Sequence, residues 1–167
     1  MGELAGLEWT NIDFNQGVIN VVQSQKFNER SKSYYISGTK NGKNRTIPIT
    51  DDLQNVFDRI KSVQSKYGKT GEFVFSTETG AANKRQISDY MYNKKIQYGI
   101  SQPVSIHAER RTLNSTMEAE GIPAAVRSAI LSHSERVNVH NYTYDATDIE
   151  YKREVLARAG KQCYSMG

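Results

Sequence analysis

Apolar and polar positions alternate along parts of the first fifty residues, and this alternation predicts β-strands. The three alternating or β-branched runs cover residues 14–22, 34–39 and 45–50. Asn41-Gly42 separates the last two runs, and this dipeptide readily adopts the positive φ angles of a tight hairpin. We therefore predict three antiparallel strands, the last two joined through this hairpin, with Lys40 held beside the turn.

The apolar spacing elsewhere is helical. Glu3 to Leu7 resembles the last turn of a helix. Further helices are predicted from a cap at 50–52 to Gly68, from Asn83 to Ile96, over 105–120, from Pro123 to Leu131, over 137–144 and over 148–159. The stripe of the second of these helices would be Ile87, Tyr90, Met91 and Ile96. The fold class is thus α+β, mainly helical, with a small three-stranded antiparallel sheet at one edge.

Composition indicates one globular domain over residues 1–167. The chain is 37% hydrophobic and 24% charged, and its net charge of +4 permits a polyanionic partner without requiring one. Cys163 is the only cysteine, so neither a disulfide framework nor a thiolate metal cluster is expected. No apolar run is long enough to span a membrane and no signal peptide opens the chain, which favours a cytoplasmic protein without membrane contact.

Groups suited to phosphate chemistry gather near the C-terminus. His107 and Arg110 are three residues apart on a predicted helix, so both side chains can reach one phosphate. His133 lies within Leu-Ser-His-Ser, and Tyr142 follows it by nine residues. A planar guanidinium matches two phosphate oxygens, whereas a phenol with an ordinary pKa near ~10 needs a base or nearby cations before it can act as a nucleophile.

Each of these residues also has a structural interpretation. Arg110 could pair with Glu109 or Glu118, and His133 could cap a helix end. Lys40 could be a solvated charge at a sheet edge. The chain has 10 tyrosines, and Tyr144 is an immediate alternative to Tyr142.

Five motifs in a fixed order resemble the catalytic domain of tyrosine recombinases, the phage integrase family. They are Gly2-Glu3-Leu4 with Leu7 and Trp9, Lys40 before Arg45-Thr46-Ile47-Pro48, His107-x-x-Arg110, Leu131-Ser132-His133-Ser134, and Tyr142. The resemblance covers almost the whole chain and is nearest to integrases of phages or conjugative transposons, which implies a bacterial or phage-encoded protein associated with the nucleoid.

The resemblance implies site-specific DNA recombination, the integration or excision of a mobile element. Tyr142 would attack the scissile phosphate and form a 3′-phosphotyrosyl link. Arg110 and His133 would stabilise the transition state, Lys40 would protonate the departing 5′-oxygen, and His107 would be the general base or a proton shuttle. This chemistry needs no cofactor and no metal, and the sequence has no phosphate-cradling glycine loop.

Glu3 matches the acidic residue that supports the active site in this family. The family's first catalytic arginine would stand two residues before Gly2, and its core-binding domain would precede that arginine. We therefore expect a chain truncated at its N-terminus, inactive or severely impaired alone. Ser132 replaces a usual glycine, and Glu109 replaces a usual apolar residue, so its side chain either turns to solvent or pairs with Arg111.

The partner implied is double-stranded DNA, bound by a homotetramer of the full-length protein, whereas this chain alone would be a monomer. Candidate phosphate contacts are Lys43, Arg45, Lys84, Arg85 and Arg111. In the family, a helix placed like residues 148–159 often docks on a neighbouring protomer, but we expect it to pack on its own core here. Two alternatives are a type IB topoisomerase and a non-catalytic DNA-binding module of the same fold.

Overall fold

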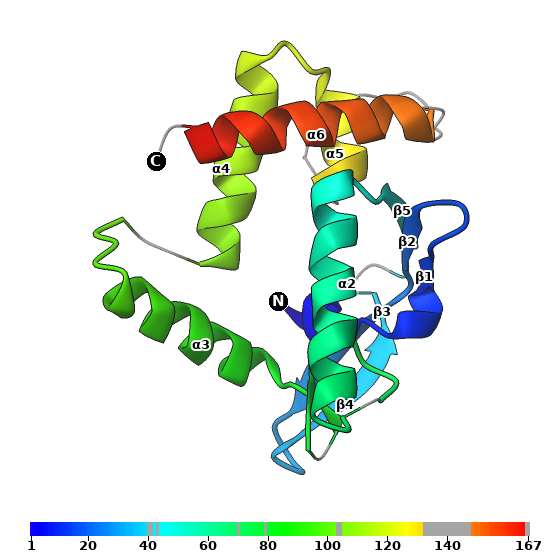
Figure 1. Ribbon diagram of the computed structural model, residues 1–167, viewed down its shortest axis with the longest axis vertical. Coiled ribbons are helices and arrows are strands. Elements are labelled where there is room, and N and C mark those ends of the chain that lie inside the picture. The colour runs from blue at the N-terminus through cyan, green and yellow to red at the C-terminus, as the bar shows by residue number, and fades with distance from the viewer. Residues whose placement is uncertain are drawn as a thin grey trace.

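A computed structural model describes residues 1–39, 42, 44–69, 71–78, 80–102, 105–131 and 148–165. The fold is α+β, as predicted (Figure 1). Its elements are α1 (Gly2–Ala5), the 3-10 turn η1 (Trp9–Asn11), β1 (Ile12–Asp13), β2 (Val18–Val21), β3 (Gln23–Asn28), β4 (Ser33–Gly38), β5 (Arg45–Pro48), α2 (Asp51–Lys66), β6 (Ser76–Thr77), β7 (Gly80–Ala81), α3 (Lys84–Gln97), α4 (Ile106–Ala119), α5 (Ala124–Leu131) and α6 (Ile149–Ser165).

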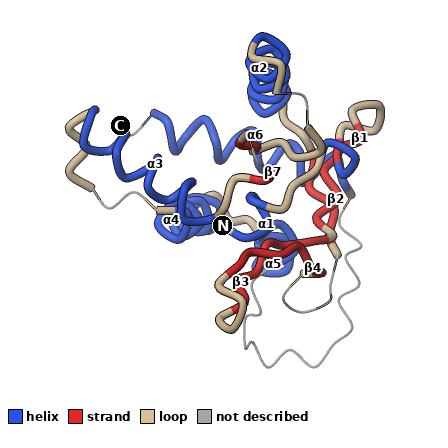
Figure 2. The backbone as a smooth tube through the Cα atoms, turned by 90° about the horizontal axis from the view of Figure 1, so that it is seen from below, coloured by secondary structure: helices blue, strands red, loops and turns tan. Residues whose placement is uncertain are grey.

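A three-stranded antiparallel sheet exists, as predicted, but its membership differs: the unpredicted strand β1 belongs to it, and the predicted strand over 34–39, which is β4, does not. β2 lies between β1 and β5, with Ile19 opposite Ile47. β4 pairs with β3 instead of β5, and Figure 2 shows this hairpin turning away from β2. Gly42 does take a positive φ of 67°. β4 pairs with β3 through a local hairpin, whereas β5 pairs with β2, where Ile47 packs against the core.

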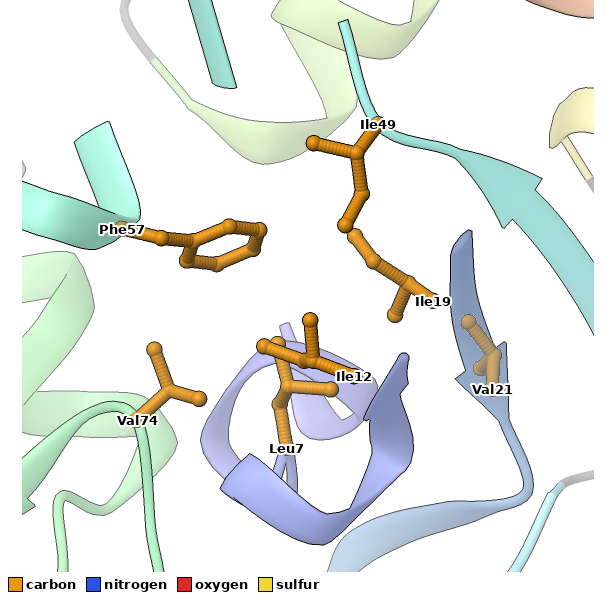
Figure 3. Close-up of a cluster of buried hydrophobic side chains, with 7 residues drawn as sticks. All are labelled: Leu7, Ile12, Ile19, Val21, Ile49, Phe57 and Val74. Carbon is orange, nitrogen blue, oxygen red and sulfur yellow. The ribbon is translucent and has the colours of Figure 1, made fainter. Parts of the chain in front are cut away.

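The first hydrophobic core lies between the sheet and α2. Figure 3 shows its seven buried side chains, which are Leu7, Ile12, Ile19, Val21, Ile49, Phe57 and Val74. Thr50 caps α2 by accepting a hydrogen bond from the Leu53 amide, and Gly68 has a φ of 63° just after the helix ends. Both predicted boundaries of this helix are confirmed.

The second core lies among α4, α5 and α6. Its buried members are Met117, Ile122, Val126, Ile130, Leu131, Val155 and Ala159. α6 crosses α4 (Figure 1), and Val155 and Ala159 on its inner face are fully buried. The expectation that this helix packs on its own chain is therefore confirmed.

Helix α3 stands apart from both cores. Asn83 accepts hydrogen bonds from the amides of Arg85 and Gln86, and the Gln86 side chain accepts one from the Asn83 amide, so the predicted cap is confirmed. None of its residues is buried, and Tyr90 and Ile96 from the predicted stripe are 63% and 61% exposed. The predicted helix over 137–144 lies outside the described residues. Among the helices that are described, none has the length and apolar character needed to cross a membrane.

Candidate active site

Glu3 is placed by the close approach of α1 to β3. A β-carbon on Gly2 would lie 2.5 Å from Ser24 Oγ and 2.6 Å from the Gln25 carbonyl oxygen, closer than van der Waals contact allows. Glycine at this position therefore lets the short helix lie directly on the strand. As a result, the Glu3 side chain points from α1 toward β5.

Glu3 and Arg45 form a two-pronged ion pair. Arg45 Nη1 donates to Glu3 Oε1 at 2.9 Å and Nη2 donates to Oε2 at 2.7 Å. The Arg45 side chain is only 11% exposed. This hydrogen bonding lowers the pKa of Glu3 and outweighs the opposing effect of burial, while the charges of Arg45 and Arg110 lower the pKa further. The carboxylate is therefore ionised at neutral pH, and it ties α1 to the start of β5.

Arg110 connects α4 to the end of α5. Its Nη1 donates to the carbonyl oxygen of Leu131 at 2.5 Å, and the side chain is half-buried. That bond uses one of the five N–H donors of a guanidinium. His107 lies one turn earlier on α4 and is exposed. This half of the candidate site thus presents a fixed cation beside an accessible imidazole.

Several charges meet around the chain's first residue. Burial lowers the pKa of the Met1 amino group, and the charges of Arg110 and Lys84 lower it further, whereas Glu3 raises it. These electrostatic effects require Arg110, Lys84 and Glu3 each to lie near the Met1 amino group. Figures 1 and 2 both show the N-terminus close to the start of α4. Residues far apart in sequence therefore converge on one positively charged region.

The described candidate DNA contacts differ in accessibility. Arg45 is committed to Glu3 and mostly buried, which the sequence did not indicate. Lys84, Arg85 and Arg111 are exposed, and Arg85 lies 3.8 Å from Asp89. Lys84 opens α3, where its backbone amide donates to the Gln25 side chain. Three of the four described candidates are thus accessible to a phosphate backbone.

Four other candidate residues, Lys40, Lys43, His133 and Tyr142, lie outside the described residues, as do Ser132 and Tyr144. Their parts in the site stay predictions. Glu109 is described and exposed, so of its two predicted arrangements the one that turns to solvent is found. Within the described part of the chain, no three His, Cys, Asp or Glu side chains form a group that could hold a metal ion.

Nothing in the sequence identified the groups that bind the side chains of Arg110 and Arg153. No residue-type signal marks the Leu131 carbonyl as the acceptor for Arg110, because every residue carries a backbone carbonyl. Arg153 on α6 was also missed, although it donates to the Ile49 carbonyl oxygen at 3.0 Å. Arg153 lies between buried Lys152 and exposed Glu154, and no pattern in the sequence marks it.

Comparison with known proteins identifies the family. The model of the phage integrase family matches residues 1–148. The chain belongs to the phage integrase family. A tyrosine recombinase XerC-like protein of Caldanaerobacter subterraneus subsp. tengcongensis is 30% identical over 165 residues, covering 86% of this chain and 41% of that protein. The predicted family is therefore confirmed.

Solved structures of integrases and recombinases share the fold. The Tn1549 transposon integrase in complex with circular intermediate DNA matches with a TM-score of 0.65 and 20% identity, covering 98% of this chain and 54% of that one. The XerA recombinase matches with a TM-score of 0.60 and 16% identity, covering 93% and 51%. The chain spans about half the length of these phage integrase relatives.

Proposed function

We propose that residues 1–167 are the catalytic domain of a site-specific recombinase that cleaves and rejoins double-stranded DNA through a 3′-phosphotyrosyl intermediate. The observation that carries the proposal is the placement of Arg110 on α4. Its guanidinium is held by the carbonyl oxygen at the end of α5, and its charge acts on Glu3, the partner of Arg45. A half-buried arginine fixed by a backbone carbonyl is preorganised for the charge that develops on an attacked phosphate.

In the proposed cleavage step, the phenolic oxygen of Tyr142 forms a bond to phosphorus as the bond from phosphorus to the 5′-oxygen breaks. His107 takes the phenolic proton, and Lys40 gives a proton to the departing 5′-oxygen. Arg110 and His133 stabilise the negative charge on the non-bridging oxygens. The free 5′-hydroxyl of another strand reverses the step, so rejoining needs no external energy source.

Glu3 supports this step without touching DNA. Its ion pair holds Arg45 at the first residue of β5, five residues after Lys40 in the sequence. Exposed Lys84, Arg85 and Arg111 would contact the phosphate backbone, which gives salt-dependent affinity and little sequence information. The full-length protein would act on DNA as a homotetramer, in the bacterial cytoplasm.

Trapping of the covalent intermediate tests the proposal. The full-length protein is incubated with duplexes that together cover the genomic DNA on both sides of its gene. Each duplex carries a nick, so that cleavage near the nick releases a short strand with a 5′-hydroxyl and rejoining is prevented. We expect a covalent protein–DNA adduct on a denaturing gel. Tyr142→Phe should abolish the adduct and keep DNA binding, whereas the matched variant Tyr144→Phe should retain it.

Three results would overturn parts of this proposal. An adduct that persists in Tyr142→Phe and vanishes in Tyr144→Phe assigns the nucleophile to Tyr144. An adduct with relaxation of supercoiled plasmid, but without strand exchange between two duplexes, indicates a topoisomerase. DNA binding without any adduct indicates a non-catalytic module.

A further inference from the structure

Arg153, in the second turn of α6, contacts backbone groups from the first fifty residues of the chain. Its Nη1 donates to the Ile49 carbonyl oxygen at 3.0 Å, and its Nη2 lies 3.3 Å from the Gly17 carbonyl oxygen and 3.5 Å from that of Gln16. We call these contacts the Arg153 clamp. They join the start of α6 to the turn between β1 and β2 and to the end of β5 (Figure 1).

The turn that receives Arg153 is itself fixed. Asp13 accepts hydrogen bonds from the amides of Asn15 and Gln16, both at 2.9 Å. The Gly17 carbonyl oxygen also accepts the Ile49 amide at 2.8 Å, so the turn is bound to the chain that follows β5. Arg153 therefore binds a rigid acceptor and not a free loop.

Gly17 keeps the space that the guanidinium occupies. Its φ is 63°, and a β-carbon there would lie 2.9 Å from Arg153 Nη1. The positive φ favours glycine, and any larger residue there would force the guanidinium to shift. The contact therefore depends on the glycine in the turn as well as on the arginine of α6.

The clamp gives α6 directional contacts, which its apolar face does not provide. Val155 and Ala159 hold the helix on the second core, but burial of apolar surface has little directional preference. Charge-assisted hydrogen bonds to three carbonyl oxygens are directional, and they join the start of α6 to the β1–β2 turn and to the residue after β5.

The start of α6 limits the position of the proposed nucleophile. Tyr142 precedes Ile149 by seven residues. Seven residues span at most about 25 Å when fully extended, so a displaced α6 displaces the volume that Tyr142 can reach. We propose that Arg153 is a positioning residue for DNA cleavage, which acts by fixing the start of α6. This inference rests on the proposed function.

The test uses the full-length protein and the nicked duplex that gives an adduct with the parent. We expect Arg153→Ala to lower the single-turnover cleavage rate at saturating DNA on the order of 10- to 100-fold. The Kd for DNA should change less than about twofold, because Arg153 does not touch DNA in this scheme. Arg153→Lys should recover part of the rate, since an ammonium still donates but lacks the guanidinium's fork.

Two comparison variants separate positioning from stability. Glu154→Ala changes an exposed neighbour on the same helix and should cleave like the parent. Val155→Ala removes fully buried methyl groups from the same helix and leaves the clamp intact. Arg153→Ala should lose more rate than Val155→Ala at an equal or smaller loss of Tm. Equal losses of rate and Tm in both variants would overturn the inference.

An activity-independent measurement distinguishes failure of the clamp from failure of the proposed function. Amide hydrogen exchange in residues 149–155 should accelerate at least about tenfold in Arg153→Ala, while exchange in α4 stays unchanged. Unchanged exchange in 149–155, or an unchanged cleavage rate, overturns the clamp alone. Absence of an adduct with the parent overturns the proposed function and the role in cleavage with it.

Discussion

The two hydrophobic cores differ in how the chain builds them. The first core collects residues from Leu7 to Val74, drawn from the sheet, α2 and the connecting segments. The second comes from residues 117–159, in α4, α5, α6 and the link between α4 and α5. Glu3 and Arg45 belong to elements around the first core, and Arg110 belongs to the second. The geometry of the candidate site therefore depends on how the two cores are held relative to each other.

Several arginine side chains connect the elements around one core to the elements around the other. Arg153 on α6 donates to the carbonyl oxygens of Ile49 and Gly17, and Arg110 lies near Glu3. Hydrogen bonds can be lost singly, whereas a packed core is lost cooperatively. The geometry of the site can therefore be disturbed while both cores stay folded.

Truncation of one buried side chain in each core should have the largest effect on stability. Phe57→Ala should cost about 3–5 kcal/mol and Met117→Ala about 2–5 kcal/mol, because both side chains are almost fully buried. Urea unfolding measures the loss. Amide exchange should rise mainly in α2 and β2 for Phe57→Ala, and mainly in α4 to α6 for Met117→Ala. Equal acceleration across both regions in each variant would show that the cores form one cooperative unit.

Removal of the Arg110 guanidinium should affect chemistry more than affinity. We expect Arg110→Ala to lower the rate of covalent adduct formation on the order of 100-fold or more at saturating DNA. Quenched time courses on the nicked duplex measure this rate.

Arg111→Ala is the matched control for Arg110→Ala, because it changes an exposed arginine one position along α4. It should weaken DNA binding and reduce the salt slope by about 1, with the saturating rate kept. A rate loss as large as that of Arg110→Ala would assign the phosphate-stabilising role to both arginines.

Loss of the Glu3 charge should have an intermediate effect that depends on pH. Glu3→Gln should lower the free energy of unfolding by about 1–3 kcal/mol at neutral pH, because Arg45 is left mostly buried without its anion. The pKa of Glu3 is lower in the folded protein than its ordinary value of 4.5. The pair's contribution is therefore fully present above pH 4.5 and is lost as the pH falls through the folded-state pKa.

Urea titrations of the parent and of Glu3→Gln between pH 7 and pH 3 measure this dependence. The difference in free energy should be largest at neutral pH and should shrink below pH 4.5. A difference that grows toward acid pH would contradict an ionised Glu3 in the folded state.

The smallest effect is expected for the cap of α3, the helix outside both cores. Asn83→Ala should cost about 1 kcal/mol, because two amide groups lose their acceptor. Asn93→Ala changes an exposed asparagine inside the same helix and should be neutral or slightly stabilising. Helicity and unfolding midpoints measured by circular dichroism distinguish the two. Equal effects would show that the cap does not hold this helix.

Much of the helical part of the fold could be predicted from local signals. Thr50 and Asn83 each cap the helix that the sequence assigned to them, and Gly68 ends α2. β3 was missed because Gln23–Asn28 is largely polar, so it lacks the alternation that marks a strand over a core. The pairing of β5 was wrong because strand partners depend on long-range burial and not on the nearest turn.

For the described candidate residues, the element that carries each one was predictable, whereas the contacts it makes were not. Glu3, His107 and Arg110 are found on the elements expected for them. Arg45 was expected to meet DNA phosphates, yet it pairs with Glu3, because only the folded chain brings positions 42 residues apart together. The carbonyl acceptors of Arg110 and Arg153 have no signature in sequence.

Helix α1 has a consequence for how sequence changes near Glu3 would act. A four-residue helix has little stability of its own, so the position of its carboxylate depends on contact with the strand below. Gly2 permits that contact, and at Gly6 a β-carbon would lie 3.1 Å from the Gln25 amide nitrogen. The location of the negative charge beside Arg45 therefore depends on the absence of a side chain at positions 2 and 6. Adding a single methyl group at position 2 would move that charge without altering any charged residue.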